Sequence, residues 1–363
     1  MAQVDNQTGL SFCFFQKAAR ERERFDVLVL RGTFDFARDD APIEFAQEQA
    51  PIVDCDEHAG PVKTNPLAAV LAREGDLVIH KPSTDVHVLG TARPPHHRPS
   101  TDWLASVSVG PTTKTVRLVG PRFFERRRGG FTLTATQPTD AVALDYRHAF
   151  GGAFRVPGSL FEDGQDVYLL KDDNPAGCGW LPDENALRSV AREARPYFEA
   201  HIEATERMPA PQIEHPNDPI KSPFQRSAAQ GTGPIARWWS PRTRYTGTLD
   251  ARWLAEKYPA LPDDFDPRFH QSAHPDLICP AYLRGDEGVV LDGLTPEGRV
   301  SMRLPGVVPL CGLRRESGTP DGGRLELDTV VVDLDHRRVS LLWRGTFHRR
   351  DPVRQIAVEL FRM

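Results

Sequence analysis

Histidine and carboxylate residues gather in two segments of the sequence where they could bind a metal. In segment 54–58 (DCDEH), three such residues stand at alternate positions and would share one face of a strand, as converging ligands must. His270 and His274 have the i, i+4 spacing of a zinc-binding helix, but Gln271 stands where that motif has glutamate. An exposed acidic turn accounts better for the first segment, and the incomplete motif argues against the second. The sequence therefore predicts no bound metal and no cofactor.

Nucleophilic and nucleotide chemistry lack their sequence signatures. The chain has no G-x-S-x-G turn, and its five cysteines include no C-x-x-C pair and have no evident histidine partner. The glycines at 151–152 and 177–179 are not followed by the lysine and hydroxyl residue of a phosphate loop. An odd number of scattered cysteines favours reduced thiols in a cytoplasmic protein.

Loop carboxylates leave one enzymatic interpretation open. A hydrolase could use Asp145 and His148 together with the carboxylates of segment 263–266, if the fold brought these loops to one site. Carboxylates so close together in a proline-bounded turn are more often capping groups than catalytic pairs. The sequence favours a protein that is not an enzyme, and a hydrolase remains the alternative.

Several charged residues stand among glycine, proline and tryptophan, where such residues commonly hold irregular backbone in place. We expect them to be mostly buried or half-buried and hydrogen-bonded to backbone or to each other, because an unpaired buried polar group costs about 1–3 kcal/mol. This set comprises Asp85, Asp145, Arg147, Arg242 and Asp250.

The adjacent Trp238 and Trp239 either close a corner of the core or present a rigid contact surface. A short helix is expected over 251–257, with Asp250 as its N-cap, and it must end before Pro259. The full set of candidate structural or partner-binding residues is Asp85, Asp145, Arg147, His148, Trp238, Trp239, Arg242, Asp250, Trp253, Asp264 and Asp266.

The composition of the chain is that of a globular protein. With 363 residues, of which 39% are hydrophobic, the chain is long enough for one large core or two moderate ones. The formal net charge of -5 gives no overall basic field, so no nucleic-acid partner is expected. The sequence has no span near 20 apolar residues and no basic start before an apolar run, so we expect no membrane partner and no signal peptide.

Short alternating segments, separated by proline and glycine, dominate the chain and predict strands. Segment 25–36 is apolar on both faces at first, as a central strand requires, and segments 325–335 and 339–347 read as a hairpin. Strands are also expected over 77–81 and 85–92. Closely spaced strands without intervening helices indicate an antiparallel sandwich or barrel-like sheets, not a doubly wound parallel sheet.

A few short helices complete a mainly β, or β-rich α+β, fold. One is expected over 66–74, between Pro66 and the stop at Gly75, and a helical insertion is expected around 183–207. The chain forms either one unit over 1–363 or two β-rich lobes, which would be 1–182 and 234–363, joined by a helical and proline-rich connection over 183–233.

Eight motifs of the chain occur together in a known order. They are LVLRGTF (28–34), HKPSTDVHVLGTA (80–92), DYRHAFGG (145–152), NPAGCGW (174–180), PQIEHP (211–216), WWSPRTRYTGTLDARW (238–253), PALPDDFDPRF (259–269) and DTVVVDL (328–334). This set resembles a family of bacterial proteins first catalogued as a domain of unknown function and encoded beside type VI secretion genes. The resemblance covers nearly the whole chain, and Leu249 departs from it where an aromatic residue is expected.

The resemblance implies a non-catalytic role. Proteins of that family are regarded as adaptors or chaperones that help to load a secreted effector, a toxin, onto the VgrG or PAAR protein of the spike. We therefore expect this protein to bind an effector and VgrG or PAAR in the cytoplasm and to turn nothing over. A structural component of the secretion apparatus is a further alternative, and it would need a self-assembling surface.

The expected lack of a structural metal gives a first prediction. Treatment with EDTA should leave the melting temperature unchanged, because removing a structural zinc ion would remove folding free energy directly. Differential scanning calorimetry with and without the chelator is the measurement. A large drop in the melting temperature would contradict the prediction.

Overall fold

A computed structural model describes residues 3–19, 23–36, 43–60, 63 and 66–362. The fold is mostly β, as the alternating segments predict, and within the described residues it contains several sheets of which none closes into a barrel. None of the helices in this part of the chain has the length and apolar character needed to cross a membrane. All five cysteines are free, as their spacing predicts.

The segment predicted to be a central strand is an interior strand of the largest sheet. Val27 to Leu30 are fully buried, because neighbouring strands cover both edges and apolar layers cover both faces. The predicted hairpin is present, and its first strand pairs in parallel with the strand that begins at Asp85. The order across the sheet is β2 (Ser11–Ala18), β3 (Arg24–Asp35), β25 (Arg338–His348), β24 (Glu326–Asp333) and β7 (Asp85–Leu89), and β4 (Glu44–Phe45) also pairs with β3.

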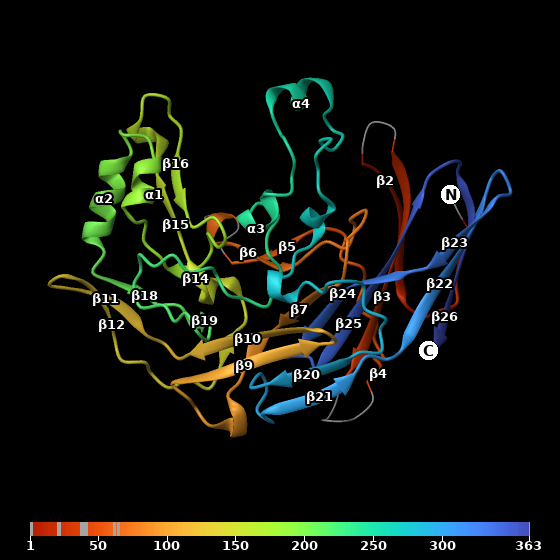
Figure 1. Cartoon of the computed structure of the whole chain (residues 1–363), viewed down its shortest axis with the longest axis horizontal. Coiled ribbons are helices and arrows are strands. Elements are labelled where there is room, and N and C mark those ends of the chain that lie inside the picture. The colour runs from red at the N-terminus through yellow and green to blue at the C-terminus, as the bar shows by residue number, and fades with distance from the viewer. Residues whose placement is uncertain (1–2, 20–22, 37–42, 61–62, 64–65, 363) are drawn as a thin grey trace.

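Two further sheets lie beside the largest one (Figure 1). One has the order β19 (Ile213–Glu214), β10 (Thr112–Val119), β9 (Asp102–Val109), β20 (Gly288–Asp292) and β21 (Arg299–Arg303), and the other has β1 (Gln3–Asn6), β26 (Val353–Arg362), β22 (Val307–Arg315) and β23 (Pro320–Arg324). Buried side chains from all three sheets form one apolar core, for example Val86, Val107 and Val358. Strands from segments 1–182 and 234–363 pair directly, as β3 does with β25.

Smaller sheets surround this core. They are β12 (Gly130–Leu133) with β11 (Phe123–Arg127) and β18 (Arg207–Pro209), β13 (Val142–Ala143) with β8 (Thr91–Ala92), β14 (Phe150–Gly151) with β17 (Cys178–Gly179), β15 (Ala153–Val156) with β16 (Val167–Leu170), and β5 (Glu57–Ala59) with β6 (Val70–Arg73). Most pairs in the structure are antiparallel, as expected, but β1–β26, β7–β24 and β14–β17 are parallel. The sequence pattern does not distinguish parallel from antiparallel strands, because side chains alternate with period two in both kinds of strand.

The helical insertion is present as two helices, α1 (Glu184–Ser189) and α2 (Arg195–Ala204). Pro196 stands in the first turn of α2, where its missing N–H costs no hydrogen bond. Phe198 of α2 packs with Val156 and Leu169 in a small core of its own, apart from the large one. Figure 1 shows this helical part at one end of the molecule.

Two local predictions are wrong. The helix expected over 66–74 is a single 3-10 turn at Pro66–Ala68 followed by β6, because Val70 and Leu71 are buried in a strand that pairs with β5. The strand expected over 77–81 is irregular. Its carbonyls accept hydrogen bonds from side chains rather than from a neighbouring strand: Arg344 Nη1 donates to Val78 O at 2.8 Å, and Thr346 Oγ1 donates to Ile79 O at 2.6 Å.

Residues 244–268 form a projection from the sheets, which we call the arm. The short helix α3 (Ser240–Thr243) precedes it, and the predicted helix α4 (Ala251–Glu256) lies at its outer end (Figure 1). The two sides of the arm are joined where Asp266 N donates to Tyr245 O at 3.1 Å, and Leu261 N reaches Ala19 O at the end of β2 at 2.8 Å. The 3-10 turns Pro267–His270 and Pro275–Leu277 follow as the chain returns to the sheets; the others are Pro95–His97, Tyr146–His148 and Gly158–Leu160.

Gly151, a glycine of the DYRHAFGG motif in β14, lies very close to the backbone of Asn174. A Cβ atom at this position would lie 2.1 Å from the carbonyl oxygen of Asn174, a contact that backbone must shift to relieve. Gly151→Ala should therefore lower the free energy of unfolding by about 1–3 kcal/mol, measured by urea denaturation. Gly288→Ala in β20 is the control, because a Cβ there would have open space. Equal losses in the two variants would refute the close approach.

Candidate functional site

Four buried charged residues lie between the base of the arm and the largest sheet, and we call them the ionic cluster: Glu74, Lys81, Asp85 and Arg242. Lys81 Nζ donates to Asp85 Oδ2 at 2.9 Å and to Glu74 Oε2 at 3.0 Å. Arg242 Nη2 lies 2.8 Å from Glu74 Oε1. None of these side chains is more than 8% exposed. The ionic cluster thus links residues 74–85 to Arg242, which is far away in the sequence.

Local structure explains how each member reaches the cluster. Asp85 begins β7, and Lys81 stands four residues earlier in the irregular segment, so both side chains reach the same place. Glu74 follows directly after β6. Arg242 lies in α3, where Nε donates to Phe269 O at 2.9 Å and Nη1 to Ile235 O at 2.8 Å. One guanidinium therefore holds the backbone on both sides of the arm.

Ser272 and His87 extend the ionic cluster. Ser272 N donates to Asp85 at 2.8 Å, and its hydroxyl donates to Glu74 at 2.6 Å. The same hydroxyl lies 3.2 Å from His87 Nε2. Because backbone and side chain of Ser272 both bind the buried carboxylates, the segment after the arm is fixed to the sheet as firmly as the segment before it.

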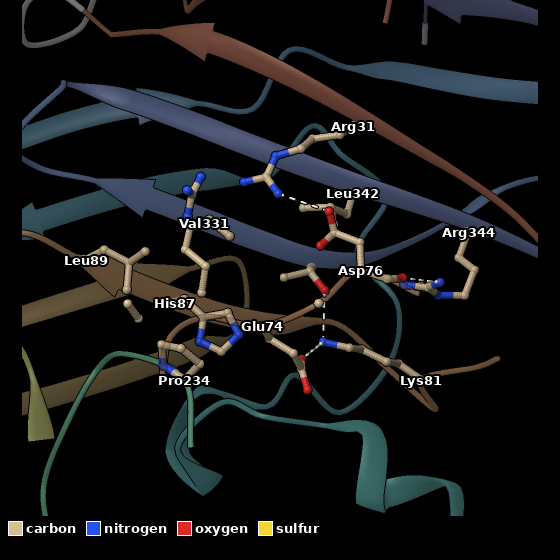
Figure 2. A pocket seen from close by; sticks show the side chains of 14 residues that line it. Arg31, Glu74, Asp76, Lys81, His87, Leu89, Pro234, Val331, Leu342 and Arg344 are labelled. Carbon is tan, nitrogen blue, oxygen red and sulfur yellow. Dashed lines mark hydrogen bonds and ion pairs between the residues drawn. The ribbon is translucent and has the colours of Figure 1, made fainter. Parts of the chain in front are cut away.

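A small cavity lies beside these side chains (Figure 2). Its volume is about 40 Å³, which is room for two or three water molecules and too little for an organic substrate. His87 Nδ1, in the cavity wall, is buried without a hydrogen-bond partner among the described residues. The described residues also contain no group of three or more histidine, cysteine, aspartate or glutamate side chains placed to hold a metal ion.

The charges of Lys81 and Glu74 stabilise each other, whereas burial raises the pKa of Asp85 above its ordinary value although Lys81 opposes this. Burial alone would lower the pKa of Lys81, but the attraction of Asp85 and Glu74 outweighs burial and raises that pKa above its ordinary value. Burial alone would raise the pKa of Glu74, yet Lys81 and Arg242 hold it well below its usual range. Burial and then the charge of Lys81 lower the pKa of His87 to about 3, so its ring is neutral at neutral pH.

The predicted residues Asp145, Arg147 and His148 lie elsewhere, in and before the 3-10 turn Tyr146–His148. Asp145 caps this turn by accepting from Arg147 N at 2.9 Å and also pairs with the Arg147 guanidinium at 2.7 Å. His148 Nδ1 lies 3.1 Å from Gln212 Oε1. Asp145 is half-buried, as expected, but Arg147 is exposed, because a two-residue spacing lets it reach Asp145 from the surface.

The predicted carboxylates of the arm are capping groups. Asp250 accepts from Trp253 N at 2.7 Å as the N-cap of α4, and it is exposed, contrary to expectation, because α4 projects into solvent. Asp264 accepts from the backbone and the hydroxyl of Thr248 at 2.9 and 2.8 Å. Asp266 caps the 3-10 turn that follows it by accepting from Arg268 N at 2.9 Å.

The tryptophans have divided roles. Trp239 is fully buried and packs edge-on against Tyr146, with ring centroids 5.2 Å apart. Trp238 is 40% exposed and touches Trp239 edge-on. Trp253 in α4 is half-buried, and its indole Nε1 donates to Ala260 O at 2.9 Å, which closes the outer end of the arm. One member of the Trp238–Trp239 pair is therefore core and the other is surface.

Sequence reasoning found Asp85 and Arg242 but missed Glu74, Lys81, Ser272 and His87. The i, i+4 spacing of Lys81 and Asp85 was a usable signal, although Pro82 between them removed any helical interpretation. Nothing in the sequence places Ser272 beside them, because its contacts with Asp85 and Glu74 span 187 and 198 residues.

Comparison with known proteins identifies a family. A model of the family described as "Uncharacterized protein conserved in bacteria (DUF2169)" matches residues 21–344. Neither the curated proteins nor the solved structures contain a significant match to the chain.

Removing the central cation of the ionic cluster should be costly. Lys81→Met takes away the ammonium and leaves Asp85 buried without its counter-charge, so the free energy of unfolding should fall by about 3–5 kcal/mol. Lys257→Met is the control, because Lys257 pairs with Asp263 at the surface, where a pair contributes about 0–1 kcal/mol. Urea denaturation of both variants provides the measurement, and a loss below about 1 kcal/mol for Lys81→Met would show that the cluster does not hold the fold.

Proposed function

The chain belongs to the DUF2169 family of bacterial proteins, and on this premise we propose that it is a non-catalytic adaptor or chaperone. It binds a type VI secretion effector in the cytoplasm and helps to load it onto the VgrG or PAAR protein of the spike. The eight motifs that resemble the secretion-associated family support this choice of partners. The observation that carries a binding role is the exposure of apolar side chains on the arm.

Three large apolar side chains gather at the outer part of the arm. Leu249, Leu254 and Tyr258 are 54%, 62% and 65% exposed, within ten residues of one another in the sequence. Single exposed apolar residues need no explanation, but a group of them on a projection typically marks a contact with another protein. Tyrosine is among the side chains that most often dominate the binding free energy at protein interfaces, and the leucines add apolar contact area beside it.

The arm is also ordered before any partner binds. Thr248 and Asp264 join its two sides by two hydrogen bonds, and Trp253 packs edge-on against Tyr258, with ring centroids 5.7 Å apart. At its base, the ionic cluster holds Arg242 and Ser272. A surface that is already ordered loses little conformational entropy on binding, which favours recognition over catalysis as its use.

The residues proposed for the alternative hydrolase have structural partners of their own. Asp145 caps a turn, His148 contacts Gln212, and Asp264 joins the two sides of the arm. Capping and bracing account for these side chains without a substrate. They support the adaptor over the enzyme.

Replacing the apolar side chains of the arm should abolish the complex. The triple variant Leu249→Ser, Leu254→Ser and Tyr258→Ser should no longer co-purify with the effector and the spike protein encoded by neighbouring genes, because it loses the exposed apolar area of the arm. Delivery of the toxin into competitor cells should fall with it.

The matched control replaces an apolar side chain that is as exposed but lies on a sheet. Leu104→Ser in β9, where Leu104 is 61% exposed, should keep both the complex and toxin delivery. Unchanged melting temperatures would show that all variants are folded. A triple variant that still forms the complex would remove the arm as the binding surface, and turnover by the purified protein that is lost in Asp145→Asn or His148→Gln would replace the adaptor with an enzyme.

A further inference from the structure

We propose that the cavity at the base of the arm binds an acidic peptide segment of a partner protein through Arg244 and Arg268. This inference rests on the proposed function, because the segment would belong to a protein that the adaptor carries. The cavity has a volume of about 300 Å³, large enough for one or two side chains of a peptide. It lies between α3, the two sides of the arm and segment 271–280.

The charges that line this cavity are all of one sign. Among the residues that the structure describes, its charged lining residues are Arg242, Arg244 and Arg268, and none is a carboxylate. Glu74 neutralises Arg242 at 2.8 Å, and Asp266 pairs with Arg268 at 2.5 Å. Arg244 is exposed, and it has no ion-pair partner within the described part of the chain. The cavity therefore carries an uncompensated positive charge on a chain whose net charge is -5.

Tyr245 contacts both of the accessible arginines. The guanidinium of Arg244 lies 4.8 Å from the centre of the Tyr245 ring, and that of Arg268 lies 4.5 Å from it. Stacking on an aromatic ring orders long side chains and leaves the N–H groups of Arg244 available at the edges. Arg268 already donates from Nε and Nη2 to Asp266, so it contributes its remaining N–H groups. A carboxylate that binds here meets guanidinium groups that are already placed, so it gains charge-assisted hydrogen bonds at a reduced entropic cost.

The walls of the cavity select a peptide over a free anion. Pro241, Pro275, Pro280 and Ile278 line it, and they offer apolar surface beside the arginines. A phosphate ion would gain nothing from such walls, whereas a peptide with an apolar residue next to aspartate or glutamate uses both.

The walls of the cavity are held in place by hydrogen bonds to residues next to the ionic cluster. Gln271 Nε2 donates to Ser83 Oγ at 2.8 Å, and Cys279 N donates to Thr84 O at 2.8 Å. Both acceptors lie just before Asp85, a member of the ionic cluster, and Arg242 belongs to the cluster and to the cavity wall alike. The cavity is therefore formed before a ligand arrives.

Fluorescence anisotropy with labelled peptides tests the proposal on the full-length protein. The probes are fluorescein-labelled decapeptides in which aspartate or glutamate alternates with leucine or phenylalanine, and the reference set has asparagine or glutamine at the acidic positions. The acidic probes should bind and the amide probes should not. Arg244→Glu should weaken binding by about tenfold or more, which corresponds to about 1.4 kcal/mol.

The matched control places the same charge change elsewhere on the arm. Arg252→Glu in α4 alters an arginine that is 80% exposed and does not line the cavity, so binding should change by less than about twofold. Millimolar inorganic phosphate should leave the acidic probe bound. Displacement by phosphate, equal binding of the amide probes, or an equal loss in the two variants would overturn the proposal.

The outcomes separate this inference from the adaptor function. If no acidic probe binds while the wild-type protein still co-purifies with effector and spike protein, the cavity proposal fails and the adaptor stands. If the acidic probes bind as expected but no complex forms in cells, the adaptor fails and the peptide site stands. An unchanged melting temperature of Arg244→Glu would show that its loss of binding is not a loss of folding.

Discussion

The ion pairs of Lys81 with Asp85 and Glu74 are the interaction on which the rest of the structure depends. Taking an ammonium and two carboxylates out of water costs several kcal/mol per ion, and only close, well-satisfied contacts offset this cost. Arg242 and Ser272 provide the remaining contacts, so the ionic cluster is complete only when both ends of the arm are in place. Buried ion pairs of this kind add little net free energy to folding, because desolvation offsets most of their attraction. Removing one partner is costly, however, so they favour the one backbone arrangement in which all partners meet.

Two further buried arginines, Arg31 and Arg344, continue the ionic cluster across the face of the largest sheet (Figure 2). Arg31 pairs with Asp76 at 3.1 Å, and Arg344 pairs with Asp328 at 2.5 Å. Arg344 also binds the carbonyls of Asp76 and Val78, which replaces the backbone ladder that an apolar, alternating segment would otherwise form. The irregular path of residues 77–81 places Lys81 at the base of the arm. The bonds of Arg344 to this segment therefore also help to position the ionic cluster that holds the arm.

The two proposed binding surfaces lie at opposite ends of the arm. The exposed apolar side chains belong to α4 and the residues next to it, at the outer end of the arm (Figure 1). The cavity with Arg244 and Arg268 lies at the base of the arm, and Arg242 connects that cavity to the ionic cluster. A partner that contacts both would bind to apolar area and to positive charge at once. Apolar contacts contribute most to affinity, and complementary charge contributes to orientation and rate.

The sequence by itself determined the β-rich class, the central strand over 25–36, the hairpin near the C-terminus and the cap and helix at Asp250, because each of these depends on residues close together in the chain. Tertiary structure decided the rest. Val70 and Leu71 became a strand because β5 offered a partner, and Trp239 became core while Trp238 did not because Tyr146 covers only one of them. Glu74 and Ser272 meet only through contacts that span almost 200 residues, and periodicity and capping rules carry no information over such distances.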